Sequence, residues 1–186
     1  MINVEEKTDE ELVVYIREEN KEYFSYILDR YESKLRRYLY KFIHDLDDVD
    51  DLLQNTFLNA YINLQSFNSS KKFSSWIYRI AHNLAINLIK KNKFTISIDE
   101  NELLAFKLES KISVKKEFQN KELSDQLSKA INKLPEKYKV PFVLKYFEDR
   151  SYEEISDILR KPKNTVGTMI SRAKDILKNE LDQYDR

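Results

Sequence analysis

The chain has 186 residues with 32 basic and 32 acidic side chains, and its hydrophobic fraction of 41% is enough for one ordinary domain or two small ones. Because it contains no Cys and a single Gly, disulfides, thiolate metal sites and glycine-rich phosphate loops are excluded, and His44 and His82 show no metal-ligand spacing. No catalytic constellation is visible and no apolar run approaches the roughly 20 residues that span a bilayer, so we expect a cytoplasmic protein that is not an enzyme, does not insert into a membrane and needs no cofactor or metal.

Hydrophobic residues recur at helical spacing through the first half of the chain. This pattern predicts helices over about residues 9–19 and 21–44, and a third helix that Asp47 caps and that carries apolar positions as far as Leu64. The polar run over residues 68–72 predicts a loop.

The fourth predicted helix, over about residues 74–91, lies in a stretch without acidic residues. No Asp or Glu occurs between Leu52 and Ile98, whereas a run of Asp lies just upstream. One interpretation of the missing acids is a pair of solvated helices whose acidic residues lie elsewhere by chance. A solvated surface helix, however, normally carries both signs of charge. A basic face with aromatic neighbours instead favours binding of a polyanion with exposed bases. The polar face of this helix carries Arg79, His82, Asn83, Asn87 and Lys90.

Periodicity fades between residues 94 and 112 and returns at Phe118, and Pro135 then ends the pattern. We therefore predict an all-α protein of two small helical domains joined by a flexible linker. The N-terminal helical bundle is assigned to residues 1–93, the linker to 94–113 and a C-terminal helix-turn-helix domain to 114–186.

The second half of the chain contains the helix-turn-helix pattern. A first helix is expected over residues 140–147 with Pro141 in its first turn, and residues 151–154 form a capping box at the start of the second. After a short basic turn, Asn164 or Thr165 caps a final helix whose exposed face is small, polar and basic. Such a helix can read base edges in the major groove, and a purely structural helical hairpin is the alternative.

Three segments, in this order, resemble the extracytoplasmic-function (ECF) class of bacterial sigma factors. DVDDLLQNTFLNAY (48–61) is similar to the core-binding helix of that family, and FSSWIYRIAHNLAIN (73–87) to its segment that contacts the promoter −10 element. LPEKYKVPFVLKYFEDRSYEEISDIL and the TV helix that follows (134–166) are similar to its −35-reading domain. The resemblance covers about residues 23–181, and the three segments in register are far more specific than any one alone.

The resemblance implies a non-catalytic sigma factor, which binds core RNA polymerase and directs promoter-specific transcription initiation. Its partners would be the clamp helices of the largest polymerase subunit, the polymerase flap, single-stranded −10 DNA, duplex −35 DNA and an anti-sigma factor. The positions implied for core polymerase are Asp48, Asp51, Leu52, Gln54 and Phe57. Those implied for −10 DNA are Asn68, Ser69, Lys71, Lys72, Phe73, Arg79, His82, Asn83, Asn87, Lys90 and Lys91. Those implied for −35 DNA are Lys163, Asn164, Thr165, Thr168, Ser171, Arg172 and Lys174.

The chain departs from the family pattern in the C-terminal domain. Arg160 and Asn164 stand where the family often has Gly, and the common T-V-K-S-R of the family corresponds to T-V-G-T-M over residues 165–169. Two cations are thereby lost from the recognition helix, so the −35 preference of better-known members does not carry over. Gly167 also costs about 1 kcal/mol relative to Ala inside a helix.

Two alternatives stay open at the level of sequence. Trp76 lies at the edge of the apolar stripe and is better explained as a core residue than as a base-stacking one, and Phe73 has the same two interpretations. The alternative function is a stand-alone helix-turn-helix transcriptional regulator. Such a regulator has no use for an acidic face over residues 48–57 beside a basic one.

Overall fold

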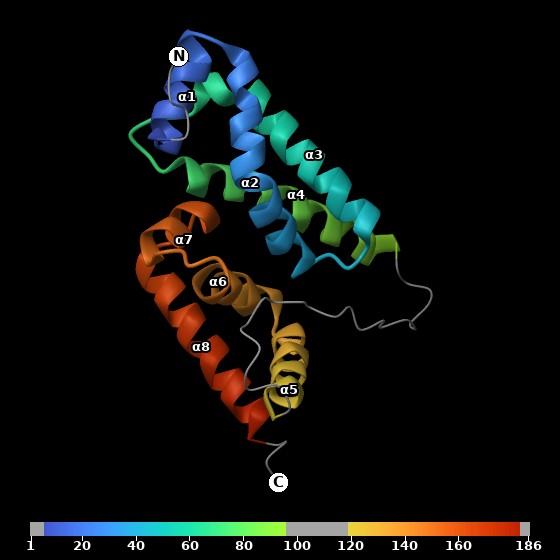
Figure 1. The fold of residues 1–186 in the computed structure, drawn as a ribbon. Coiled ribbons are helices and arrows are strands. Elements are labelled where there is room, and N and C mark those ends of the chain that lie inside the picture. The colour runs from blue at the N-terminus through green and yellow to red at the C-terminus, as the bar shows by residue number, and fades with distance from the viewer. Residues whose placement is uncertain (1–5, 96–118, 183–186) are drawn as a thin grey trace.

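The computed structural model describes residues 6–95 and 119–182, with side chains from 6–92 and 126–182. Over these residues the chain folds into α-helices and short 3-10 turns without any strand, which confirms the all-α prediction (Figure 1). The helices are α1 (Asp9–Glu18), α2 (Phe24–Tyr40), α3 (Leu46–Ile62), α4 (Phe73–Thr95), α5 (Gln119–Lys133), α6 (Glu136–Tyr146), α7 (Tyr152–Leu159) and α8 (Lys163–Leu181). The 3-10 turns are η2 (Lys21–Tyr23) and η3 (Leu64–Ser66).

Side-chain caps begin two of the helices that matter most for function. The capping box predicted for α7 is confirmed, because Glu154 N donates to Ser151 Oγ at 3.2 Å and Ser151 N donates to the Glu154 carboxylate at 2.9 Å. The cap predicted for α3 is wrong by two residues. Asp45, not Asp47, accepts from the backbone N–H groups of Asp47 and Asp48 at 2.9 and 3.1 Å.

Prolines set the start of two further helices, and here the predicted starts are wrong. Helix α6 begins directly after Pro135, which places Pro141 in the second turn of the helix instead of the first. Helix α8 begins directly after Pro162, so Asn164 and Thr165 lie inside the helix and do not cap it. A proline just before a helix needs no N–H partner of its own, since the first N–H groups of a helix are unpaired in any case.

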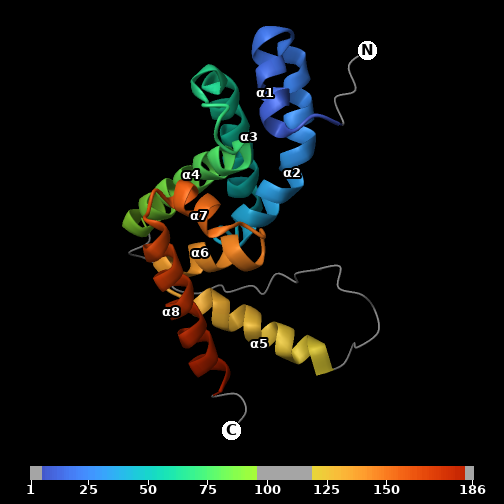
Figure 2. The same cartoon turned by 90° about the vertical axis from the view of Figure 1, so that its left-hand side faces the viewer.

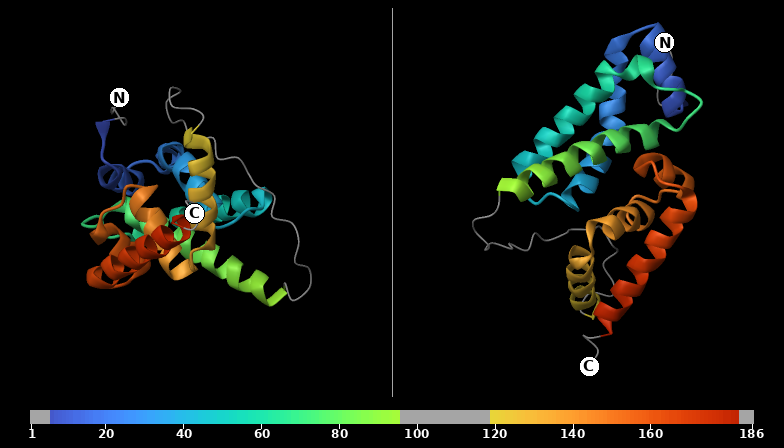
Figure 3. Two further views of the ribbon diagram at one scale, coloured as in Figure 1. Left: turned by 90° about the horizontal axis from the view of Figure 1, so that it is seen from below. Right: turned by 180° about the vertical axis from the view of Figure 1, so that it is seen from behind.

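Helices α1–α4 form an N-terminal body and helices α5–α8 form a C-terminal body (Figures 1 and 3). In the N-terminal body α2, α3 and α4 pack on one another, and α1 contacts both α2 and α4. In the C-terminal body α8 packs against α5, α6 and α7. The linker predicted over residues 94–113 lies outside the described residues from residue 96 onward, and residues 94 and 95 continue α4.

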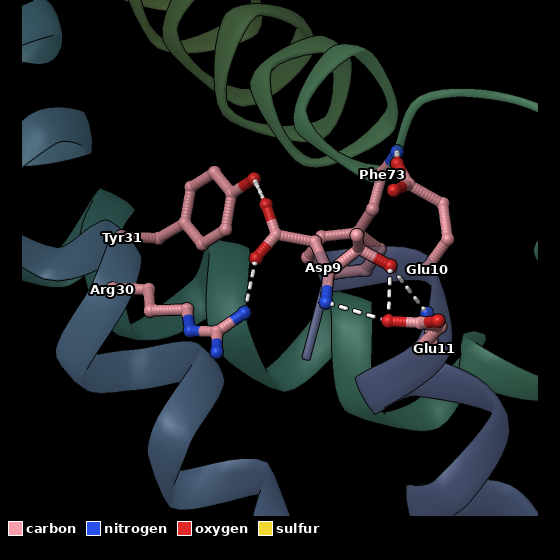
Figure 4. Close-up of polar contacts among 7 residues, drawn as sticks. Asp9, Glu10, Glu11, Arg30, Tyr31 and Phe73 are labelled. Atoms are coloured by element: carbon pink, nitrogen blue, oxygen red, sulfur yellow. Dashed lines mark hydrogen bonds and ion pairs between the residues drawn. The ribbon is translucent and has the colours of Figure 1, made fainter. Parts of the chain in front are cut away.

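Helix α1 ties the N-terminal body together through its acidic first turn (Figure 4). Asp9 accepts hydrogen bonds from Arg30 Nη1 at 2.8 Å and from the Tyr31 hydroxyl, both on α2. Glu10 accepts from the backbone N–H of Phe73, the first residue of α4, at 2.7 Å. Helix α4 has no acidic residue in its own first turn. The carboxylate from α1 instead accepts from an N-terminal N–H group and interacts favourably with the positive end of the helix dipole.

We expect Glu10→Ala to lower the free energy of unfolding by about 1 kcal/mol, the usual loss for a removed helix cap. Glu18→Ala is the matched control, because Glu18 lies on the same helix with an exposed side chain. Urea denaturation followed by far-UV circular dichroism measures both. An equal loss in the two variants would mean that the contact with Phe73 contributes nothing.

The two bodies share one continuous hydrophobic cluster. It runs from the core of α2, α3 and α4 into α6, α7 and the first turns of α8, where it includes the buried side chains of Val143, Ile155 and Ile158. A second, smaller cluster joins α5, α6 and α8 around Phe142 and Leu177. Helix α7 consequently lies along the N-terminal half of α4 (Figures 1 and 2).

Arg160 closes α7 in the left-handed conformation, with φ 50° and ψ 45°. Its N–H and that of Lys161 both reach the carbonyl of Ser156, the latter at 3.2 Å, which is the closure that Gly usually provides at a helix end. The turn geometry is therefore kept without the glycine. A residue with a Cβ pays roughly 1–2 kcal/mol for this conformation.

We expect Arg160→Gly to raise the free energy of unfolding by about 1 kcal/mol, because glycine adopts the left-handed conformation without steric strain. Lys161→Gly is the matched control and should be neutral or destabilising, since Lys161 has no positive φ to relieve. Thermal unfolding compares the two variants with the parent. A lower Tm for Arg160→Gly would contradict the strain argument.

Candidate nucleic-acid interface

The loop over residues 68–72 is held from behind by Arg17 of α1. The Arg17 guanidinium donates from Nε to the Leu64 carbonyl at 2.8 Å and from Nη2 to the carbonyls of Leu64 and Phe67. Leu64 begins η3, and its carbonyl also accepts from the Phe67 N–H at 3.2 Å, whereas the Phe67 carbonyl leads into the loop. One side chain therefore ties both ends of this turn to α1. Arg17 was not expected from the sequence, because no local pattern relates residue 17 to a loop about fifty positions later.

Asn68 folds the loop on itself. Its Oδ1 accepts from the Ser70 N–H at 3.0 Å and from the Ser70 hydroxyl at 2.8 Å, and the Lys71 N–H donates to the Asn68 carbonyl at 2.9 Å. The side chains of Lys71 and Lys72 are exposed at the end of this turn. The loop thus presents two cations directly before the start of α4.

A pocket of about 130 Å³ opens between this loop and α4. The Ser75 hydroxyl is buried here, with the residue 4% exposed, and has no hydrogen-bond partner among the described residues. Phe67 and Trp76 pack on one side of it with a ring-centroid distance of 5.3 Å and an angle of 47° between the ring planes. The pocket therefore combines an aromatic wall, a cationic rim and an unused polar group. Its lining is Ser66, Phe67, Asn68, Lys71, Lys72, Ser75, Trp76, Arg79 and Asp157.

Phe73, which the resemblance included among the −10 residues, lies in the core. It is 0% exposed, and its ring packs against Tyr31, Phe67 and Trp76 at centroid distances of 5.6, 5.4 and 5.5 Å. Trp76 is partly buried, since it packs on the core and also lines the pocket. Phe73 therefore supports the site from inside and does not meet a ligand directly.

The polar face of α4 is divided between covered and open residues. Arg79 and His82 are half-buried, whereas Asn83, Asn87, Lys90 and Lys91 are exposed. Burial lowers the pKa of His82 to about 4, and its Nδ1 lies 3.2 Å from the Tyr38 hydroxyl. His82 is therefore uncharged at neutral pH and can offer a hydrogen bond but no charge.

The acidic face of α3 is only partly as the sequence suggests. Asp51 and Gln54 are exposed and Asp48 is half-exposed, whereas Leu52 and Phe57 belong to the hydrophobic core. The outer surface of α3 also carries two apolar side chains that are not among the predicted core-polymerase positions. Leu58 and Ile62, four residues apart, are 54% and 66% exposed. Their position off the buried stripe is the signal that could have identified them.

The predicted −35 residues all lie exposed on α8. Arg172 Nη1 lies 3.4 Å from the Tyr138 hydroxyl, and Lys174 Nζ lies 5.3 Å from the centre of the Tyr146 ring, so α6 supports both cations. Lys163 pairs with Glu153 of α7. A Cβ added to Gly167 would meet Tyr152 at 3.8 Å, an ordinary contact, so packing within the protein does not require glycine there.

Two further findings limit the chemistry of the described residues. Among the side chains described, those of residues 6–92 and 126–182, no group of three or more His, Cys, Asp or Glu could hold a metal ion. Of the helices within residues 6–95 and 119–182, none combines the length and hydropathy needed to cross a membrane.

Comparison with known proteins assigns this arrangement to a family. The chain matches the models for Sigma-70 region 2 over residues 27–95 and Sigma-70, region 4 over residues 124–177. It is 32% identical over 173 residues to the ECF RNA polymerase sigma factor SigW of Bacillus subtilis. The aligned region covers 89% of this chain and 92% of that protein.

Two solved structures share the fold over most of the chain. CnrH in complex with the cytosolic domain of CnrY has a TM-score of 0.70 at 21% identity and covers 94% of this chain and 97% of that one. The sigma factor RpoE of Bartonella quintana, in complex with the anti-sigma factor NepR, has a TM-score of 0.68 at 20% identity and covers 86% and 96%. With both sigma regions matched in order and a relative of this similarity over nearly its full length, the chain belongs to the ECF family of RNA polymerase sigma factors.

Proposed function

We propose that this sigma factor captures a base of the −10 non-template strand in the pocket between the 68–72 loop and α4. The observation that carries the proposal is the buried Ser75 hydroxyl, which has no partner among the described residues and lies in a pocket with an aromatic wall and a cationic rim. Buried polar groups are normally hydrogen-bonded, so such a hydroxyl is suited to a ligand. A base edge supplies both donors and acceptors.

The energetics of base capture fit this pocket. Extruding a base from the duplex costs a few kcal/mol, and stacking on an aromatic side chain returns roughly 1–3 kcal/mol per base. Trp76, which is partly buried and lines the pocket, offers such a ring. Lys71, Lys72 and Arg79 lie at the rim and are suited to the flanking phosphates. The exposed Asn83, Asn87 and Lys90 continue the same face along α4 for the following nucleotides.

Helix α8 is proposed as the −35 reader. A recognition helix enters the major groove by its first turns, where Asn164, Thr165 and Thr168 are exposed. Arg172 and Lys174, supported by tyrosines of α6, are suited to phosphates at the groove edge.

The outer face of α3 is proposed as the contact with core polymerase. Asp48, Asp51 and Gln54 can form charge-assisted hydrogen bonds to basic clamp helices, and Leu58 and Ile62 add exposed apolar surface beside them. This face distinguishes the proposal from a stand-alone helix-turn-helix regulator, which needs no such surface. Leu52 and Phe57 support it from the core.

The remaining parts of the proposal follow from the family. We infer a non-catalytic role in the cytoplasm, contact of the C-terminal body with the polymerase flap, and control by an anti-sigma factor. The solved structure of RpoE with the anti-sigma factor NepR supports the last point through its shared fold.

Run-off transcription tests the proposed function as a whole. Core polymerase is assayed with and without the protein on genomic promoter fragments, and co-elution of protein and core is measured by gel filtration. A promoter-dependent transcript together with co-elution is expected. A protein that gives no transcript and does not co-elute with core is not acting as a sigma factor.

We expect Asn83→Ala to reduce open-complex formation about tenfold, corresponding to about 1.4 kcal/mol, with core binding unchanged. The reason is that Asn83 lies exposed on the −10 face of α4 and outside the α3 face. Permanganate reactivity of unpaired thymines reports opening, and gel filtration reports core binding. Asn179→Ala, an exposed Asn at the end of α8, is the matched control. Equal loss of opening and core binding would contradict the assignment.

We expect Asp51→Ala combined with Gln54→Ala to weaken core binding at least about tenfold, since hydrogen bonds to charged partners contribute about 1.5–3 kcal/mol each. Both side chains are exposed, so the helical content should not change. Titration of labelled protein with core polymerase measures the affinity, and far-UV circular dichroism measures the fold. Asp29→Ala on the exposed side of α2 serves as control. Loss of helical signal would make these residues structural instead.

A further inference from the structure

The −10 surface, meaning the 68–72 loop and the polar face of α4, is half covered by the C-terminal body. We propose that α7 and the segment before it act as an intramolecular inhibitor, whose carboxylates occupy the −10 surface in place of DNA phosphates. The inference rests on the proposed function of that surface. The free chain is closed, and single-stranded promoter DNA gains access when the two bodies separate.

Helix α7 places its acidic side chains where the DNA backbone is expected. Asp157 Oδ1 lies 3.3 Å from Lys71 Nζ and forms part of the wall of the base pocket. Glu154 Oε1 accepts from the Ser74 hydroxyl at 3.4 Å, one turn away. Arg79 is held near both Asp157 and Arg160, and burial lowers its pKa. Lys71, a cation proposed for DNA, thus already has a carboxylate partner, and Ser74 beside it has another.

Glu148 fastens the closed arrangement beside this surface. Its side chain is 1% exposed, and it accepts from the Tyr78 hydroxyl at 2.6 Å and from Arg37 Nε and Nη2 at 3.3 and 3.4 Å. Arg150 lies 4.4 Å from the centre of the same Tyr78 ring. Burying a carboxylate costs free energy unless it is paired. The residues that pair with Glu148, Tyr78 and Arg37, belong to the N-terminal body. Separation of the bodies returns Glu148 to water and removes the reason for its burial.

The closed arrangement blocks the −10 surface but leaves the other proposed surfaces open. The predicted −35 residues on α8 are exposed, as are Asp51, Gln54, Leu58 and Ile62 on α3. Core polymerase can therefore bind α3 before the bodies part. If core polymerase binds the open form more tightly than the closed form, it shifts the equilibrium between them toward the open form. The size of the shift is set by the ratio of the two affinities. In this mechanism core polymerase binds α3 first, and the single-stranded −10 DNA binds the −10 surface afterwards.

Carbodiimide cross-linking of the full-length chain tests the closed state directly. This zero-length reagent joins an amine and a carboxylate that are in contact, so mass spectrometry should detect a Lys71–Asp157 amide in the free protein. Addition of core polymerase should reduce its yield. A free protein without this cross-link, or a yield that core polymerase leaves unchanged, would overturn the proposal.

Binding of single-stranded DNA tests the inhibition. The probe is a fluorescein-labelled 12-nucleotide single strand of random sequence, followed by fluorescence anisotropy. Glu148→Gln combined with Asp157→Asn removes two inhibitory charges with nearly equal side-chain volume. If about one molecule in ten of the parent is open, the double variant binds the probe up to about tenfold more tightly, because the apparent affinity scales with the open fraction.

Glu153→Gln is the matched control for added positive charge. Glu153 lies on α7 but pairs with Lys163 inside the C-terminal body. It is combined with Asp175→Asn, an exposed position on α8, so that this control also loses two negative charges. The control variant should bind the probe with the affinity of the parent. Thermal unfolding verifies that both double variants are folded. Equal affinities of the parent and the Glu148→Gln, Asp157→Asn variant would overturn the inhibition. Failure of run-off transcription would instead overturn the proposed function, whether or not the cross-link forms.

Discussion

Helix α4 carries no acidic residue, and the carboxylates that contact it come from other parts of the chain. Glu10 of α1 satisfies its first N–H group, Glu154 and Asp157 of α7 meet Ser74 and Lys71 near its start, and Glu148 accepts from Tyr78. Carboxylates from other elements stabilise the start of such a helix, because its first turn has none of its own. Both α1 and the C-terminal body contribute to this contact, in addition to the hydrophobic cluster that they share with α4.

The same electrostatic property suits α4 for DNA. A surface with Lys, Arg and Asn but no acid attracts phosphate and carboxylate alike, because both are anions that accept hydrogen bonds. Two partners with acceptor groups are available to this surface. Promoter DNA is the proposed ligand, and α7 of the same chain is the observed neighbour. In the proposed mechanism these two partners compete for the surface, whereas the predicted −35 residues of α8 are exposed.

The C-terminal body keeps the family turn with an unusual residue. Arg160 adopts the left-handed conformation and preserves the Schellman-type hydrogen bonds to Ser156, so the angle between α7 and α8 does not depend on glycine. Its position also brings a cation near Arg79, where the pKa of the Arg79 guanidinium is lowered by burial first and by Arg160 second. Gly167 has room for a side chain, so packing among the described residues does not account for the glycine.

Local pattern in the sequence determined the helices, the 68–72 loop, the Ser151 capping box and the register of the two sigma regions. These depend on interactions within a few residues, and periodicity and caps record such interactions directly. The exposed −35 residues also follow from periodicity, since one face of α8 is buried. The start at Glu136 was missed because Pro141 was placed in the first turn, and the start at Lys163 because Asn164 or Thr165 was expected to cap the helix; both helices begin directly after a proline.

Only the tertiary structure decided which residues of the predicted sites reach the surface. Phe73, Leu52 and Phe57 proved to be core residues, and Arg17, Glu10 and Glu148 proved to hold the site in place. The partners of Glu148 lie 70 and 111 positions away in sequence, and no local pattern encodes a pairing over that separation. The sequence therefore determines two amphipathic helical units and their family, and long-range packing decides that one unit lies across the other unit's basic face.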